Sequence, residues 1–187
     1  MVNTICIFAS GSSSLPAGYH SAAKELGILI GKSAQTLVYG GTNTGLMEAL
    51  ATAVQDNGGK VVGIIPKFMH EMGLAFAEAD ELVVVDDLRE RKRLMEKRSD
   101  AFVALPGGFG TLEEIMEVLA LRQLKRHAKP VALVNTNGFY SALANLFERM
   151  YREQFAKEEY REYYCIAPTP REALAYIASF ESRANTR

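Results

Sequence analysis

The chain has 187 residues, which suits one domain with a substantial core and leaves little room for a second. Hydrophobic residues make up 48% and charged residues 23%, as is usual for a soluble globular protein. The 21 basic and 22 acidic residues give a net charge of −1, which excludes a global electrostatic attraction to nucleic acid or to an anionic membrane, so any bound anion must be held by a local site.

Short apolar runs rich in β-branched residues alternate with longer segments of helical periodicity. In chain order, the pattern predicts strand Thr4–Ala9, helix Ala17–Lys32, strand Thr36–Tyr39, helix Leu46–Asn57, strand Lys60–Ile65, strand Glu81–Val85, helix Leu88–Ser99, strand Ala101–Leu105, helix Leu112–Arg126, strand Pro130–Asn135, helix Phe139–Glu153, strand Tyr163–Ala167 and helix Arg171–Glu181. The stretch Pro66–Asp80 is the least regular and is either a functional loop or contains a short buried helix. The tail Ser182–Arg187 is expected to fray.

This alternation predicts an α/β fold over residues 1–187, with a doubly wound, mostly parallel sheet flanked by helices in a Rossmann-like single domain. Ligands bind such sheets where strands end and helices begin. Three polar, glycine-bearing loops stand at those points: Ser10–Ser14, Gly40–Gly45 and Pro106–Thr111. The first of them is also ordinary turn composition.

The third loop carries the most information. Gly107, Gly108 and Gly110 allow backbone N–H groups to approach an anion, and a helix beginning at about Leu112 directs its positive end toward a phosphate. The Thr111 hydroxyl can complete that site. The alternative is a tight strand-to-helix turn in which Thr111 is the N-cap.

Two charged side chains are candidates for chemistry. Glu114 follows Thr111 by three residues, so it either completes a capping box or presents a carboxylate beside the phosphate pocket. Arg91 lies three residues after Leu88 and four before Met95, on the apolar stripe of its helix. A guanidinium on the buried side of a helix needs an anionic partner, which is either a bound ligand or the carboxylate of a structural salt bridge. The remaining alternative is that the side chain extends along the helix surface and places its charge in water.

Other classes of site are not indicated. None of the loops is G-x-G-x-x-G, and no Walker lysine follows the glycines. Cys6 and Cys165 read as buried thiols, and the three histidines have no ligand spacing, so we expect neither metal nor cofactor. The N-terminus has no basic region before its short apolar run, and no segment approaches the ~20 apolar residues of a membrane span, so a cytoplasmic location is predicted.

The motif P-G-G-F-G-T-L-E-E at 106–114 resembles the P-G-G-x-G-T-x-x-E signature of the LOG (Lonely Guy) proteins, cytokinin riboside 5′-monophosphate phosphoribohydrolases long mislabelled as lysine decarboxylases. The segments 39–47, 63–67, 90–92 and 99–105 also look like that family, so the resemblance covers nearly the whole chain. It implies a small-molecule nucleoside 5′-monophosphate as substrate and a homodimer with sites near the subunit interface. It also implies that Arg91 and Glu114 are catalytic and that the remaining site residues bind substrate and phosphate: Ser10, Gly11, Gly41, Gly45, Met47, Lys92, Pro106, Gly107, Gly108, Phe109, Gly110, Thr111 and Glu113.

Some positions depart from the family. Arg89 stands where many members have histidine, Thr42 and Glu48 stand where glycine is usual, and Gly73 replaces a frequent glutamate. These departures bear on the choice of base more than on phosphate binding. Two other functions remain: a non-catalytic carrier of a nucleotide or of the molybdenum cofactor, and a nicotinamide-dependent oxidoreductase, against which the missing G-x-G-x-x-G argues.

Overall fold

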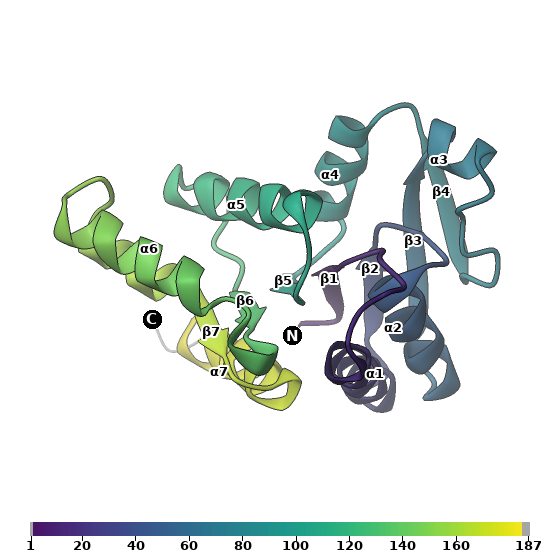
Figure 1. Ribbon diagram of the computed structural model, residues 1–187, viewed down its shortest axis with the longest axis horizontal. Helices are drawn as coiled ribbons and strands as arrows, with labels where there is room; N and C mark the ends of the chain where they lie inside the picture. Colours follow the sequence, from purple (N-terminus) through teal and green to yellow (C-terminus); the bar gives the residue numbers. More distant parts are fainter. Residues whose placement is uncertain (1, 185–187) are drawn as a thin grey trace.

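The structure, a computed structural model, describes residues 2–184. A single seven-stranded sheet stands between two layers of helices (Figure 1). The strands are β1 (Thr4–Phe8), β2 (Thr36–Tyr39), β3 (Lys60–Pro66), β4 (Glu81–Val85), β5 (Ala101–Ala104), β6 (Val131–Val134) and β7 (Cys165–Ala167). The helices are α1 (Ala17–Lys32), α2 (Gly45–Asp56), α3 (Lys67–Glu71), α4 (Leu88–Lys97), α5 (Phe109–Gln123), α6 (Ser141–Arg152) and α7 (Pro170–Ala184), with short 3₁₀ turns η1 (Thr136–Gly138) and η2 (Glu158–Tyr163).

All strand pairs are parallel, and the order across the sheet is β4-β3-β2-β1-β5-β6-β7. The chain therefore winds outward from β1 in one direction and from β5 in the other, which confirms the predicted doubly wound α/β fold. The direction of winding reverses between β1 and β5. Ligands bind sheets of this kind at that switch point.

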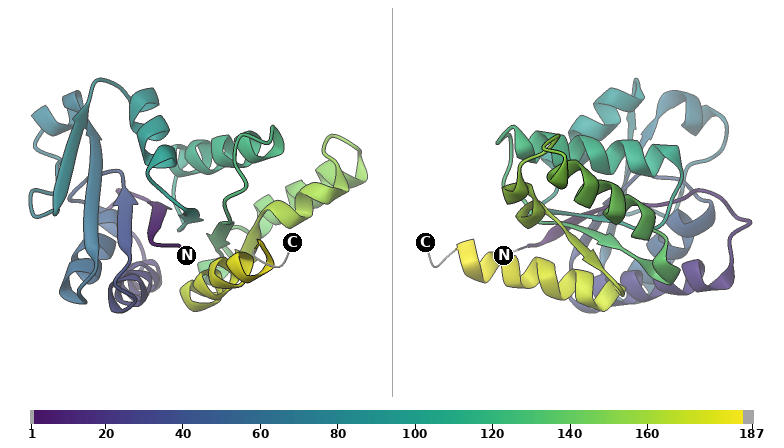
Figure 2. Two further views of the ribbon diagram at one scale, coloured as in Figure 1. Left: turned by 180° about the vertical axis from the view of Figure 1, so that it is seen from behind. Right: turned by 60° about the vertical axis from the view of Figure 1, so that its left-hand side comes forward.

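The strands are buried on both faces and each face has its own core. Ile5 and Ile7 of β1 pack with α1, α2 and α7, whereas Cys6 and Phe8 pack with Met95 of α4 and with α5. Figures 1 and 2 show α1, α2 and α7 on one side of the sheet and α4, α5 and α6 on the other. The continuous apolar runs in the sequence follow from this double burial.

Most predicted boundaries lie within two residues of the observed ones, but α5 begins at Phe109 rather than near Leu112. The stretch Pro66–Asp80 does contain a short helix, α3, yet none of its residues is buried. The predicted strand at Tyr163–Ala167 begins only at Cys165, because Tyr163 ends η2. Helix α7 continues to Ala184, and residues 185–187 of the tail that was expected to fray lie outside the described residues.

Among residues 2–184, no helix is both long enough and apolar enough to cross a bilayer.

Candidate functional site

The first two polar loops pack against each other at the switch point. The Leu46 N–H at the start of α2 donates to the Ser10 carbonyl over 2.9 Å. Gly45 has a φ of +62°, and a Cβ on it would lie 2.5 Å from the Ser12 carbonyl oxygen, so only glycine fits there. The tight contact brings the ends of β1 and β2 to one concave surface.

The third loop turns directly from β5 into α5. Gly108 is the N-cap residue, no side chain caps the helix, and the first helical bond runs from the Leu112 N–H to the Gly108 carbonyl over 3.0 Å. The N–H groups just before Leu112 therefore have no intrahelical acceptor. Gly108, Phe109 and Gly110 are exposed, so this positive helix end faces outward and can receive an anion.

The alternative of a simple strand-to-helix turn required Thr111 to be the N-cap, but the N-cap is Gly108. Thr111 lies within the first turn of α5, is 4% exposed, and packs against Gly107, where a Cβ would lie 2.5 Å from the Thr111 Cβ. Pro106, just ahead of this contact, is buried. The glycine at 107 is thus required by the threonine side chain, and both lie at the base of the amide-rich turn.

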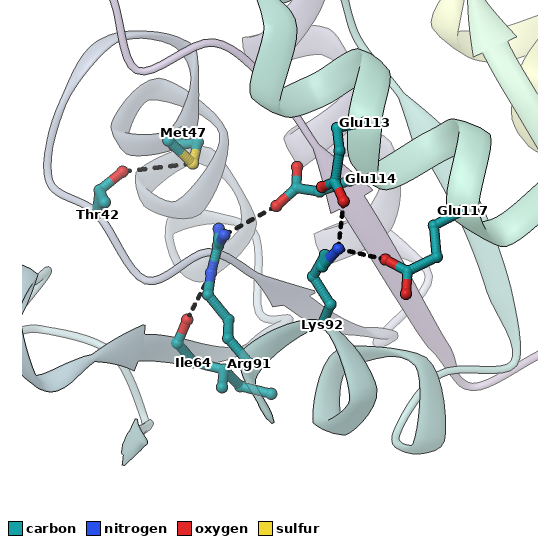
Figure 3. Close-up of polar contacts among 8 residues, drawn as sticks. All are labelled: Thr42, Met47, Ile64, Arg91, Lys92, Glu113, Glu114 and Glu117. Atoms are coloured by element: carbon teal, nitrogen blue, oxygen red, sulfur yellow. Dashed lines mark hydrogen bonds and ion pairs between the residues drawn. The ribbon is translucent and has the colours of Figure 1, made fainter. Parts of the chain in front are cut away.

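The capping-box alternative for Glu114 is wrong. Because the helix is capped at Gly108, Glu114 lies in its second turn, where the N-terminal amides are out of reach. Its carboxylate instead accepts a hydrogen bond from Arg91 Nη1 over 2.8 Å (Figure 3). The two side chains are only 11% and 9% exposed, so this is a buried ion pair between α4 and α5.

The buried environment changes the acidity of Glu114. Burial raises the pKa of Glu114 and Arg91 opposes that rise, while the nearby Glu113 charge adds to it and Lys92 reduces it. The net result is a pKa above the ordinary glutamate value. A carboxylate with a raised pKa that is still held by an arginine is a candidate for proton transfer.

Arg91 is held in place by groups from two strands. Its Nε donates to the Ile64 carbonyl of β3 over 3.2 Å, and its guanidinium lies against Gly40 at the end of β2. A Cβ on Gly40 would lie 3.0 Å from Arg91 Cζ and 3.3 Å from Met47 Sδ. Glycine at position 40 therefore leaves the space that the guanidinium occupies.

Gly40 and Ile64 were not among the predicted site residues. Gly40 was visible as the first residue of the Gly40–Gly45 loop, but nothing in the sequence shows that a guanidinium lies on it. The Ile64 contact uses a backbone carbonyl, which no side-chain pattern can reveal.

Lys92, the next residue of α4, also reaches α5. Its Nζ pairs with Glu113 and lies 2.5 Å from Glu117 Oε2 (Figure 3). Burial lowers the pKa of Lys92, but the hydrogen bonds and charges of Glu113 and Glu117 outweigh it and raise the pKa above its ordinary value. The ammonium is therefore firmly cationic and already has two carboxylate partners.

The loop after β2 is braced from its other side. Gly41 has a φ of +73°, and its carbonyl accepts from the Phe76 N–H over 2.9 Å, while the Asn43 N–H donates to the Leu74 carbonyl over 3.0 Å. Met47 lies within hydrogen-bonding reach of the Thr42 hydroxyl, with Oγ1 to Sδ 3.3 Å. The irregular segment after α3 thus supports the loop that faces Arg91.

A cavity of about 400 Å³ opens between α4 and α5, with Glu114 in its wall and Phe8 and Val118 on its apolar side. A second, smaller hollow of about 200 Å³ with a mostly apolar lining lies between α5, α6 and η2, away from the glycine loops. Within the described part of the chain, no three or more His, Cys, Asp and Glu side chains are grouped to hold a metal ion.

Comparisons with known proteins concern the sequence and the fold. A protein family described as "Possible lysine decarboxylase" matches residues 47–177. A probable cytokinin riboside 5′-monophosphate phosphoribohydrolase of Oryza sativa subsp. japonica is 39% identical over 179 residues, covering 96% of this chain and 72% of the relative. A cytokinin riboside 5′-monophosphate phosphoribohydrolase of Arabidopsis thaliana is 40% identical over 94% of this chain and 82% of its own length.

Among solved structures, the molybdenum cofactor carrier protein of Chlamydomonas reinhardtii superposes with a TM-score of 0.76 over 97% of this chain and 99% of that one. The two sequences are 20% identical, so the match concerns the fold alone.

Proposed function

The chain belongs to the LOG family, described as possible lysine decarboxylases, and from that membership we propose that it hydrolyses the N-glycosidic bond of adenosine 5′-monophosphate or an N6-substituted form of it. The products are the free base and ribose 5-phosphate. The observation that carries the proposal is the buried Arg91–Glu114 pair beside the uncapped N-terminus of α5. The Glu114 carboxylate supplies a base near the sugar, and the N-terminus of α5 holds the phosphate.

The 5′-phosphate binds at the start of α5. The free amides of the first turn and the positive helix end stabilise a dianion there, and glycines let it approach the backbone. The loops after β1 and β2 form the opposite side of the site. The proposed binding set comprises Ser10, Gly11, Gly41, Gly45, Met47, Pro106, Gly107, Gly108, Phe109, Gly110 and Thr111. The family resemblance also implies Lys92 and Glu113, but their mutual ion pair favours the different role argued below.

Glu114 acts as the general base. As the C1′–N9 bond breaks, its electron pair leaves with the base and positive charge develops on the ribose, as in other glycosidic cleavages. Glu114 stabilises that charge and takes a proton from the water whose oxygen bonds to C1′. The proton then goes to the departing base. Arg91 keeps the carboxylate oriented and balances the charge of the phosphate or leaving group.

A pyridoxal-phosphate decarboxylase, which the family description suggests, does not fit these residues. Such an enzyme needs a lysine whose amine is neutral enough to form a Schiff base. Lys92 is held as a cation by Glu113 and Glu117, and Lys67 is exposed, with Nζ 3.9 Å from Glu71. Neither lysine has the setting that this chemistry requires.

The proposal includes a homodimer, which the family resemblance implies, and the cytoplasmic location that the sequence predicts. Phe109 is 93% exposed beside the phosphate site, where a second subunit would cover it. Light scattering after size exclusion tests this part: a mass of one chain at micromolar concentration would contradict it.

The reaction is tested by incubating the protein with AMP, N6-isopentenyl-AMP, GMP, CMP and the unphosphorylated nucleosides, and separating products by HPLC. We expect base release from the adenine nucleotides and none from adenosine, since the phosphate supplies binding energy. A protein that binds AMP but releases no base from any nucleotide would be a carrier and not a hydrolase.

A further inference from the structure

Two adjacent sets of ion pairs join α4 to α5. Arg91 meets Glu114 in the buried pair, and Lys92 beside it meets Glu113 and, one turn further along α5, Glu117 (Figure 3). Consecutive residues of one helix thus hold consecutive residues of the other. The second set lies on the solvent side of the first, because Glu113 and Glu117 are both exposed.

The ammonium of Lys92 is poorly placed to bind a phosphate. Its side chain is 17% exposed and two carboxylates already contact two of its three N–H groups, so Lys92, Glu113 and Glu117 together carry one negative charge. A phosphate approaching this group meets that surplus negative charge and finds only one N–H group of the ammonium without a carboxylate partner. The contacts favour a role toward α5 over a role toward the substrate.

The other contacts of helix α4 are to its own N-cap and to the sheet. Met95 is its only buried residue, and its N-terminus is held by the Asp87 carboxylate, which accepts from two N–H groups of the first turn over 2.8 Å each. The Arg91 Nε bond to the Ile64 carbonyl fixes the guanidinium against β3. None of these contacts sets the position of Arg91 relative to α5, so the cross-links to α5 decide how the guanidinium meets Glu114.

We propose that Lys92 is a positioning residue of the active site, which ties α4 to α5 through Glu113 and Glu117, holds Arg91 against Glu114, and sets the charge that surrounds the Glu114 carboxylate. The inference rests on the proposed hydrolysis and assigns Lys92 and Glu113 to the support of Glu114 rather than to contact with the nucleotide.

The charges around Glu114 give the proposal a specific signature. From α4 the cations Arg91 and Lys92 lower the pKa of Glu114, and from α5 itself Glu113 raises it. From β1 the coupled group is the thiol of Cys6, whose pKa is raised by burial and by the Glu114 charge, so the thiol stays neutral. Removing Lys92 and removing Glu113 must therefore shift the titration of Glu114 in opposite directions.

The test compares Lys92→Met, Lys92→Arg and Glu113→Gln. For AMP hydrolysis, we expect Lys92→Met to reduce kcat about tenfold, less than the roughly hundredfold effect of a 1 Å displacement, with little change in KM. The acidic limb of its kcat/KM profile shifts to higher pH, that of Glu113→Gln shifts to lower pH, and Lys92→Arg restores the wild-type position. Arg93→Met is the matched control, because Arg93 is an exposed neighbour on α4 that pairs only weakly with Glu90, and it should behave as wild type.

A raised KM for AMP in Lys92→Met, with an unshifted pH profile, would overturn the proposal and assign Lys92 to substrate binding. The titration of Glu114 is also followed by NMR of the ¹³C-labelled glutamate carboxyl groups, with the signal identified by its loss in Glu114→Gln. Absence of base release by the wild type refutes the proposed function, whereas an unshifted Glu114 titration in Lys92→Met refutes the positioning role, so the two failures are distinguishable.

Discussion

Replacing Gly40 by alanine tests whether the position of Arg91 matters for turnover. The added Cβ would lie 1.9 Å from Arg91 Nη2 and 3.0 Å from Arg91 Cζ, whereas non-bonded atoms of this kind are separated by about 3.5 Å. The guanidinium must therefore leave its present position by about 1.5 Å. A displacement of that size costs roughly a hundredfold in rate, or about 2.7 kcal/mol of transition-state stabilisation.

The assay is kcat/KM for base release from AMP, with thermal unfolding of the same samples. We expect the melting temperature to change little, because the obstructed atoms are the far end of a flexible side chain and no backbone lies in the way. Gly18→Ala is the control: Gly18 lies in the first turn of α1, where a Cβ meets only the Asn137 amide nitrogen at 3.1 Å. Wild-type activity in a folded Gly40→Ala protein would refute the reasoning that a fixed Arg91 is needed.

Four further predictions follow from the same geometry. Glu114→Gln keeps an acceptor for Arg91 but no base, so turnover should fall about 10²–10⁴-fold while calorimetry finds AMP binding nearly unchanged. In the wild type, kcat/KM should rise with pH through the raised pKa of Glu114, above the ordinary glutamate range, and a pH–rate profile with its limb at the ordinary value would contradict this. The double variant Arg91→Met, Glu114→Met removes a buried ion pair without leaving either charge alone, so in urea unfolding it should be at least as stable as Glu114→Met alone, yet inactive. Gly27→Ala places a Cβ 2.6 Å from the Leu50 carbonyl oxygen and 2.7 Å from the Ala53 Cβ, so the free energy of unfolding should fall by about 1–3 kcal/mol in urea titrations without a change in KM.

The fold was predictable because each strand is short, apolar on both faces and separated from the next by a periodic helix. The start of α5 was misplaced because glycines are poor helix formers, and Gly110 nevertheless lies within the first turn. Helix formation there follows from the tight β5–α5 turn and the packing of Thr111 on Gly107, which are tertiary constraints.

The site was predictable only in part. Helical spacing alone predicts that Arg91 lies on the buried side of α4. It does not predict the carboxylate partner, which lies 23 residues away on another helix. Arg98 has the same spacing, seven residues after Arg91, but it is the C-cap residue of α4 and pairs with Glu81 of β4 at 2.6 Å. Spacing describes one helix, whereas the partner of a side chain depends on how α4 and α5 pack beside each other on one face of the sheet.

A buried arginine–glutamate pair has a physical cost that favours a functional explanation. Taking both charges out of water is expensive, and apolar residues of similar size usually stabilise a protein as well or better. The partly exposed contacts of Lys92 with Glu113 and Glu117 already link α4 to α5. These charges stay closer to water, so their link avoids most of the cost of burying charge. The buried pair adds something that the outer set does not, namely a carboxylate with a raised pKa within one and a half turns of an unpartnered helix N-terminus. Because Glu114 is on α5 itself, the base and the anion site at the helix N-terminus lie close together. The position of Glu114 in the helix is therefore explained by the proposed chemistry and not by the stability of the fold.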